Sequence, residues 1–192
     1  MFGREGYQGA SMKAVAKAAG VSKGLLHYHF QSKEHLLVEA QRLAFQRIHS
    51  QFEGRFKQGE YGIGTALEAL DSLWESVRSL RSWAPFMVET MSLTNREQPV
   101  RRLLDNFYDE SMELLTQGIE KVFQAETHPL VMPAARVAWM VRTTLHGLVV
   151  ELAYARTPSD FENVEQVYQD LREVFSMFIL NPQTPITIAE GV

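Results

Sequence analysis

Residues 11–30 read SMKAVAKAAGVSKGLLHYHF, and the pattern within them decides the fold of the N-terminal end. Apolar residues recur at the i, i+3, i+4 and i+7 positions of one helical face over residues 12–19, and Ser11 stands where it can cap that helix. Gly20 can adopt the positive φ that ends a helix, and Ser22 can cap a second short helix after it. Two short helices joined through a glycine predict a helix-turn-helix unit.

Three residues with helix-turn-helix spacing, Ala16, Gly20 and Leu26, hold the two helices together. The small Ala16 lets the helices approach, and Leu26 and Phe30 bury the inner face of the second helix. The outward face then carries side chains that suit base edges in a major groove, while helix N-termini and a lysine suit phosphate oxygens. The predicted DNA-binding residues are Ser11, Ser22, Lys23, Gly24, Leu25, His27, Tyr28, His29 and Lys33.

Charge is distributed unevenly along the chain. The formal net charge is −4, but residues 1–33 carry five basic residues against one acidic residue, so they contribute +4 and the remainder contributes −8. A basic module on an acidic body is the pattern expected when one part meets a polyanion. Chance clustering on a solvated surface produces the same count, so charge alone leaves both interpretations open.

The composition is that of an ordinary folded protein, with 192 residues of which 45% are hydrophobic and 22% are charged. The absence of cysteine excludes a disulfide framework, a thiolate nucleophile and a cysteine metal site, and it fits a reducing compartment. The longest stretch without a charged residue, residues 174–189, contains two prolines, so no membrane-spanning helix is predicted. The N-terminus lacks the pattern of a secretory signal. We therefore expect a cytoplasmic protein.

The rest of the chain also shows helical periodicity, which predicts an all-α fold. A long helix begins after its cap at Ser32 and ends before Gly59, and no segment alternates as a strand does. Further helices are predicted over residues 67–77, from Pro85, after Pro99, from Pro133 to about Ala155, and from a capping box of Ser159 and Glu162. Glycines are densest in residues 53–64, which predicts a seam between two domains. These are a helix-turn-helix domain over residues 1–50 and a larger helical ligand-binding and dimerisation domain over residues 51–192.

The last two predicted helices carry more apolar surface than one neighbour needs. Residues 137–154 are apolar almost all round, and Val167 and Val174 widen the apolar face of the final helix. Such helices must be covered on two sides, which predicts a homodimer formed through the last two helices as a four-helix bundle. A monomer with a thick core is the alternative.

Residues 2–40 resemble the DNA-binding region of the TetR-type transcriptional regulators. The resemblance rests on three segments: Phe2-x-x-x-Gly6-Tyr7, Ser11-Met12-x-x-Val15-Ala16-x-x-Ala19-Gly20-Val21-Ser22-x-Gly24, and Leu26-His27-Tyr28-His29-Phe30-x-Ser32-Lys33-Glu34-x-Leu36. It implies a homodimer that binds a palindromic operator on double-stranded DNA, with a helical C-terminal domain that accepts a small-molecule effector and then releases the DNA. The expected function is therefore that of a ligand-responsive repressor, whose long helix after Ser32 links the effector to the recognition helix.

Two departures from the family pattern bear on DNA binding. His27 stands where the family usually has a tyrosine that touches phosphate; a protonated histidine donates a stronger hydrogen bond, so we expect affinity to depend on pH. The family pattern also begins further upstream, so the first helix is expected to be truncated here. A chain without that helix would bind DNA poorly, which leaves a dimeric ligand-binding or scaffold protein that has lost DNA binding as the alternative function.

Motifs for other chemistry are weak or missing. His27 and His29 point to different sides of a helix and have no evident third metal ligand, and Gly62-x-Gly64 lacks the third glycine of a dinucleotide-binding motif. H-E-x-x-H does not occur, and the one G-x-S-x-G, at residues 20–24, lies in the predicted helix-turn-helix and follows no predicted strand. We therefore predict no catalytic residues, no metal and no cofactor, although a catalytic group assembled across helices would leave no motif.

Aromatic and methionine side chains of the body are candidates for an effector pocket. Such residues at helical spacing usually fill a core, but several methionines and tryptophans together also suit an adaptable apolar pocket. The predicted ligand-binding residues are Trp74, Trp83, Phe86, Met87, Phe107, Tyr108, Trp139, Thr143 and His146. They favour a flat or largely apolar organic effector.

Overall fold

The computed structural model describes residues 2–56, 61–93, 98–124 and 130–179, and the regular elements in these ranges are all helical. They are α1 (Phe2–Gly9), α2 (Met12–Ala18), α3 (Lys23–His29), α4 (Lys33–Phe56), α5 (Ile63–Ser79), the 3-10 helix η1 (Arg81–Trp83), α6 (Ala84–Leu93), α7 (Gln98–Phe123), α8 (Ala134–Tyr154) and α9 (Pro158–Ile179). The all-α prediction is confirmed. Gly59, which was predicted to follow the long helix, lies outside the described residues.

Serine caps set the limits of the N-terminal helices. Ser11 Oγ accepts a hydrogen bond from Ala14 N at 3.2 Å, and Ser22 Oγ accepts one from Leu25 N at 3.0 Å. Each cap satisfies a backbone N–H that has no partner within its helix. Gly20 takes a φ of +69° between α2 and α3, as the predicted turn requires.

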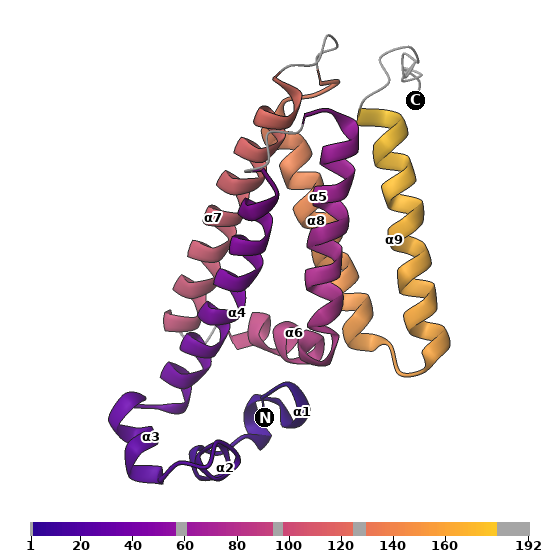
Figure 1. Ribbon diagram of the computed structural model, residues 1–192. Helices are drawn as coiled ribbons and strands as arrows, with labels where there is room; N and C mark the ends of the chain where they lie inside the picture. The colour runs from indigo at the N-terminus through magenta and orange to yellow at the C-terminus, as the bar shows by residue number, and fades with distance from the viewer. Residues whose placement is uncertain (1, 57–60, 94–97, 125–129, 180–192) are drawn as a thin grey trace, which may run out of the picture.

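The helix-turn-helix unit shares its core with the rest of the molecule. Ala16 of α2 and Leu26 of α3 are buried, as predicted, in a cluster that also holds residues of α1, α4, α6 and α7. The ring of Phe2 stacks on that of Phe86 in α6 with centroids 5.2 Å apart, and Figure 1 shows α1 lying beside α6. The N-terminal helices are therefore packed against the body.

Helix α1 is broken at Gly6, whose φ of +67° is not helical. The backbone N–H of Tyr7, the next residue, donates a hydrogen bond to Glu89 Oε2 in α6 at 2.8 Å. A Cβ at position 6 would lie 3.0 Å from that same oxygen. Glycine is thus needed twice, for the backbone conformation and for the approach of the carboxylate.

The remaining helices form a body with two long sides. In Figure 1, α4 and α7 run side by side along one side, α5, α8 and α9 form the other, and α6 crosses the end nearest α1. Asp71 of α5 holds α9 by accepting hydrogen bonds from Tyr168 Oη at 2.6 Å and from two nitrogens of Arg172. The rings of Trp74 and Tyr168 also stack, with centroids 4.9 Å apart. These contacts hold α9 against α5.

Helix α4 joins the two ends of the molecule without interruption. It runs from Lys33 to Phe56 and so passes through residues 50 and 51, where the predicted domains meet. Helix α4 therefore belongs to both of the predicted domains. The division into two domains stays a prediction. Among the residues described here, no helix is both long and apolar enough to cross a membrane.

The predicted capping box at Ser159 is wrong. Thr157 Oγ1 accepts a hydrogen bond from Asp160 N at 3.2 Å, and Asp160 Oδ2 accepts one from Thr157 N at 2.8 Å. The helix begins at Pro158, because proline fits the first helical position and the cap is then the residue before it.

Candidate functional site

The exposed side of α3 carries the predicted recognition residues. Its solvent-exposed residues are Lys23, Gly24, Leu25, His27, Tyr28 and His29. Leu26 is buried, whereas Tyr28 exposes 82% of its surface and Leu25 exposes 47%. Large side chains held out from a short, capped helix are available to a partner. The structure presents these residues as predicted, and their contact with DNA stays a prediction.

Three of the residues predicted to contact phosphate, Ser11, Ser22 and Lys33, lie at helix N-termini. Ser11 and Ser22 are exposed, and although their oxygens accept the capping hydrogen bonds, each hydroxyl hydrogen can still reach a phosphate oxygen. Lys33 is half-buried, with its Nζ 4.2 Å from the centroid of the Tyr7 ring. Tyr7 Oη also donates to Glu34 Oε1, and this hydrogen bond lowers the pKa of the Glu34 carboxyl. These contacts attach the start of α4 to α1.

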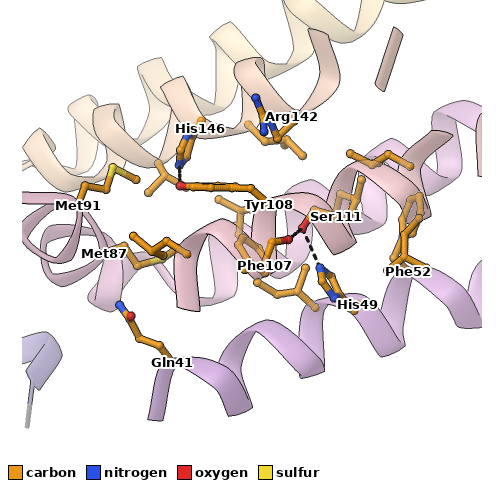
Figure 2. Close-up of a pocket in the computed structure, with 18 residues that line it drawn as sticks. Gln41, His49, Phe52, Met87, Met91, Phe107, Tyr108, Ser111, Arg142 and His146 are labelled. Carbon is orange, nitrogen blue, oxygen red and sulfur yellow. Dashed lines mark hydrogen bonds between the residues drawn. The ribbon is translucent and has the colours of Figure 1, made fainter. Parts of the chain in front are cut away.

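A cavity opens between α4, α5, α6, α7 and α8, as Figure 2 shows. Counted as space open to the centre of a water molecule, its volume is about 110 Å³. That is of the same order as an apolar cavity of ~150 Å³ that accepts benzene. Most of the lining is apolar, and its polar members are Gln41, His49, Tyr108, Ser111, Arg142 and His146. Such a lining is typical of a site for a small organic ligand. No cluster of metal-ligating side chains occurs in the part of the chain that the structure describes.

A hydrogen-bonded pair of side chains in the cavity wall joins α7 to α8. Tyr108 Oη and His146 Nε2 are hydrogen-bonded at 2.5 Å, and the Arg142 guanidinium lies 5.4 Å from the centroid of the Tyr108 ring. Burial lowers the pKa of the His146 imidazole, and the charge of Arg142 lowers it further. Burial raises the pKa of the Tyr108 hydroxyl. Both groups are therefore neutral at pH 7, and Arg142 supplies the positive charge of this wall.

A second polar group joins α4 to α7. His49 Nε2 lies 2.8 Å from Ser111 Oγ, and the His49 ring stacks on the Phe107 ring with centroids 5.1 Å apart. Ser111 donates its own hydrogen to the Phe107 carbonyl oxygen at 2.7 Å, so its oxygen accepts from the histidine N–H. This pair ties the helix that follows α3 to the wall of the cavity.

The structure brings some of the predicted ligand-binding residues together and places others elsewhere. Those that line the cavity are Met87, Phe107, Tyr108 and His146. Those that lie away from it are Trp74, Trp83, Phe86, Trp139 and Thr143. Trp74 instead stacks on Tyr168 of α9, and its Nε1 donates to Glu165 Oε2 at 3.0 Å. Trp83 and Phe86 pack into the core that α6 shares with α1.

The two sides of α8 explain the positions of Trp139 and Thr143. Arg142 and His146 are four residues apart and share the face on the cavity. Trp139 and Thr143, which are also four residues apart, share an exposed face. A segment that is apolar almost all round gives no sign of which face meets the cavity.

Sequence reasoning missed Gln41, His49 and Ser111. Gln41 lies four residues after Leu37 and seven before Ile48, so a polar residue on the apolar stripe of α4 was the available signal. His49 and Ser111 are 62 residues apart, and nothing in the sequence pairs them.

Comparison with known proteins points to one family. Residues 1–40 match the family described as bacterial regulatory proteins, tetR family. The chain is 27% identical over 160 residues to the HTH-type transcriptional regulatory protein RaaS of Mycobacterium tuberculosis, a match that covers 83% of this chain and 69% of that protein. It is 27% identical over 146 residues to the HTH-type transcriptional repressor KstR of Rhodococcus jostii, with 71% of this chain and 66% of that protein covered.

The fold is similar to that of a solved structure, the transcriptional regulator FadR of Bacillus subtilis in complex with stearoyl-CoA. The TM-score is 0.71 at 16% sequence identity, and the match covers 93% of each chain. The arrangement of helices is therefore shared.

Proposed function

We propose that this chain, whose residues 1–40 match the tetR family of bacterial regulatory proteins, is a ligand-responsive DNA-binding transcriptional regulator. It acts as a repressor, which leaves a palindromic operator when a small, largely apolar molecule fills the cavity. The observation that carries this proposal is an exposed recognition helix, α3, followed directly by a helix, α4, that forms one wall of an apolar cavity. The relatives described above are named as transcriptional regulators, one of them as a repressor.

Helix α3 supplies the proposed contacts with DNA. Lys23 donates to guanine O6 or N7, Leu25 packs on a thymine methyl group, and Gly24 lets the backbone approach the bases. His27 and Tyr28 reach the phosphates beside the groove. The net charge of +4 over residues 1–33 adds attraction to the DNA backbone.

Helix α4 couples the cavity to α3. Near its start, Leu36 and Leu37 are buried in the core shared with α1, and further along Gln41 and His49 line the cavity. A shift of this wall therefore moves α3. The effector must bind the released conformation more tightly than the DNA-bound one, because equal affinity for both shifts nothing.

We infer a homodimer formed through α8 and α9. These helices expose large apolar side chains, namely Tyr154 (69%), Val167 (47%), Val174 (49%) and Met177 (54%). Tyr154 and Val167 also line a groove between the two helices. A second copy that covers this face removes the apolar surface from water and lets two α3 helices enter successive major grooves ~34–36 Å apart.

Fluorescence anisotropy tests DNA binding. The purified protein is titrated onto labelled DNA that flanks its own gene, at two salt concentrations and with nonspecific DNA as competitor. Binding that survives competitor and weakens with salt supports an operator-binding regulator. Binding that competitor abolishes contradicts the proposal and favours a dimeric ligand-binding protein without an operator.

Two double variants test whether α3 is the recognition helix. Lys23→Ala with Tyr28→Ala should lower operator affinity by at least about tenfold, because base and phosphate contacts are removed. The matched control, Tyr61→Ala with Arg136→Ala, removes an exposed tyrosine and an exposed arginine from the body and should leave affinity unchanged. Equal operator binding by the first double variant and the wild type would show that another element contacts the bases.

A further inference from the structure

Gln41 is a polar side chain in an apolar place. It lies on α4, lines the cavity and exposes only 2% of its surface. Figure 2 shows its side chain extending from α4 toward Met87 of α6. The chemistry of its amide therefore decides what this end of the cavity accepts.

Thr90 determines which way the Gln41 amide faces. Thr90 is fully buried, and its Oγ1 donates a hydrogen bond to the Phe86 carbonyl oxygen at 2.8 Å. Having given its only hydrogen to that carbonyl, Thr90 Oγ1 can act only as an acceptor toward Gln41. It accepts from Gln41 Nε2 at 2.9 Å. The amide nitrogen of Gln41 therefore donates to α6, and the amide oxygen, Oε1, takes no part in this contact.

Gln41 Oε1 has no hydrogen-bond partner. Among the described residues, it is the only buried side-chain oxygen or nitrogen without one. Folded proteins pair nearly all such atoms, because an unpaired buried acceptor is unfavourable. A molecule that enters the cavity and donates a hydrogen bond to Oε1 removes this penalty. A molecule without a donor leaves the penalty in place.

The other groups around the cavity define the kind of donor that fits. No carboxylate lines it in the ranges that the structure covers, and Arg142 contributes a positive charge. An ammonium group would therefore share an apolar site with a like charge and no counter-ion. A neutral hydroxyl satisfies Gln41 without that penalty, on an apolar body that suits walls such as Leu73 and Met87.

We propose that the effector is a hydroxylated apolar molecule whose hydroxyl donates a hydrogen bond to Gln41 Oε1. This inference rests on the proposed function, since it names the class of molecule that fills the effector cavity. Oε1 is covered by its neighbours, so the hydroxyl reaches it by displacing a side chain, and the unbranched Met87 and Met91 of α6 line the same space. The hydroxyl then lies where α4 meets α6, and its binding moves the helix that follows α3.

Isothermal titration calorimetry with matched probes tests the proposal. The probes 4-ethylphenol, 4-ethylanisole and ethylbenzene share a ring and an ethyl group, and they carry a hydroxyl, a methyl ether and neither group, respectively. We expect the wild-type protein to bind 4-ethylphenol at least about tenfold more tightly than ethylbenzene, because a buried acceptor gains a donor. 4-Ethylanisole can accept but not donate a hydrogen bond, so it should show no such advantage.

Two glutamine variants of α4 identify the partner of the hydroxyl. Gln41→Met keeps the length of the side chain but removes the acceptor, so the preference for 4-ethylphenol should disappear. Gln46→Met, the same change at an exposed position of α4, should retain the preference. The proposal is overturned if the wild type binds the phenol and ethylbenzene equally, binds neither of them, or favours the ether as strongly as the phenol. It is also overturned if Gln41→Met keeps the preference for 4-ethylphenol. If that variant does not fold, the comparison of 4-ethylphenol with 4-ethylanisole in the wild type decides whether the proposal holds.

Failure of this inference and failure of the proposed function give different results. Operator binding without discrimination between the probes overturns the hydroxyl contact and leaves the regulator intact. Discrimination that depends on Gln41, in a protein without specific DNA binding, overturns the regulator and leaves the hydroxyl contact intact.

Discussion

At position 6, both the backbone conformation and the packing require a residue without a Cβ. The φ of +67° disfavours any residue with a Cβ, and the Glu89 carboxylate occupies the place where a Cβ would point.

At His146 the environment acts on the protonation of the side chain. It lies on α8 beside Arg142 and contacts Tyr108 of α7, and in this environment the neutral imidazole is preferred.

We expect Gly6→Ala to lower the free energy of unfolding by about 2 kcal/mol, because alanine is strained at this φ and crowds Glu89. Urea denaturation followed by circular dichroism measures the change. Gly64→Ala is the matched control: a Cβ at that position in α5 meets no atom within 4 Å. It should raise stability by about 0.5–1 kcal/mol, as alanine does in helices. A Gly6→Ala variant as stable as the wild type would contradict the role given to Gly6.

The lowered pKa of His146 predicts a stability that depends on pH. The unfolded chain takes up the proton near the ordinary value of 6.5, while the folded protein resists it. The contribution of His146 is therefore complete above that value and is lost as the pH falls through it. Urea denaturation at about pH 7.5 and about pH 5.5 should show a larger loss in the wild type than in His146→Gln. His27→Gln, which changes an exposed histidine of α3, should lose as much as the wild type.

Among the helices, α9 shows most clearly how an element is held at its end and along its side. At its start Asp160 accepts hydrogen bonds from the backbone N–H groups of Arg156 and Thr157, which lower the pKa of its carboxyl. Along its side Asp71 of α5 accepts from Tyr168 and Arg172. The exposed face of α9 belongs to the surface on which we propose that a second copy of the chain packs.

The structure assigns the cap of α9 to Thr157, two residues before the one that the sequence suggested. We expect Thr157→Ala to lower the free energy of unfolding by about 1 kcal/mol, because a backbone N–H of the first turn loses its acceptor. Ser159→Ala should have little effect, since the cap lies at Thr157. Chemical denaturation of the two variants separates the assignments, and the opposite order of stabilities would restore the cap at Ser159.

Over the whole molecule, the cavity and the recognition helix are joined by two connections. Helix α4 is the direct one, and α6 is the other, because it lines the cavity with Met87 and Met91 and holds α1 through Glu89. Both connections end in the same small core beneath α2 and α3, which contains residues of α1, α4 and α6. Under the proposed function, these packed helices are the route by which a change in the cavity reaches α3.

The proposed dimer predicts a variant that separates assembly from folding. Val167 is half-exposed in one chain, so Val167→Glu should leave folding unchanged. In the dimer it would bury an unpaired charge, so the dissociation constant should rise by about a hundredfold or more. Sedimentation velocity measures the effect. Val131→Glu, with a similar exposure outside α8 and α9, should stay dimeric. If Val167→Glu sediments as the wild-type dimer, the interface lies elsewhere.

Local patterns were sufficient for the helix-turn-helix unit and for the helical fold. The caps at Ser11 and Ser22 and the turn at Gly20 depend on atoms within a few residues of each other, so the order of residues specifies them. The cap of α9 was misplaced because two hydroxyl residues flank Pro158 and each has an acidic residue three positions later. The choice between them depended on where the proline enters the helix.

The cavity depended on contacts that no local pattern encodes. Helical periodicity shows which residues share a face but not which helix meets that face, so Trp139 could not be separated from His146 on α8. The acceptor on Gln41 is left over only because Thr90, 49 residues away, uses its hydrogen on a carbonyl of its own helix. The helix-turn-helix motif and the helix ends follow from near neighbours in the chain, whereas the cavity follows from how five helices pack.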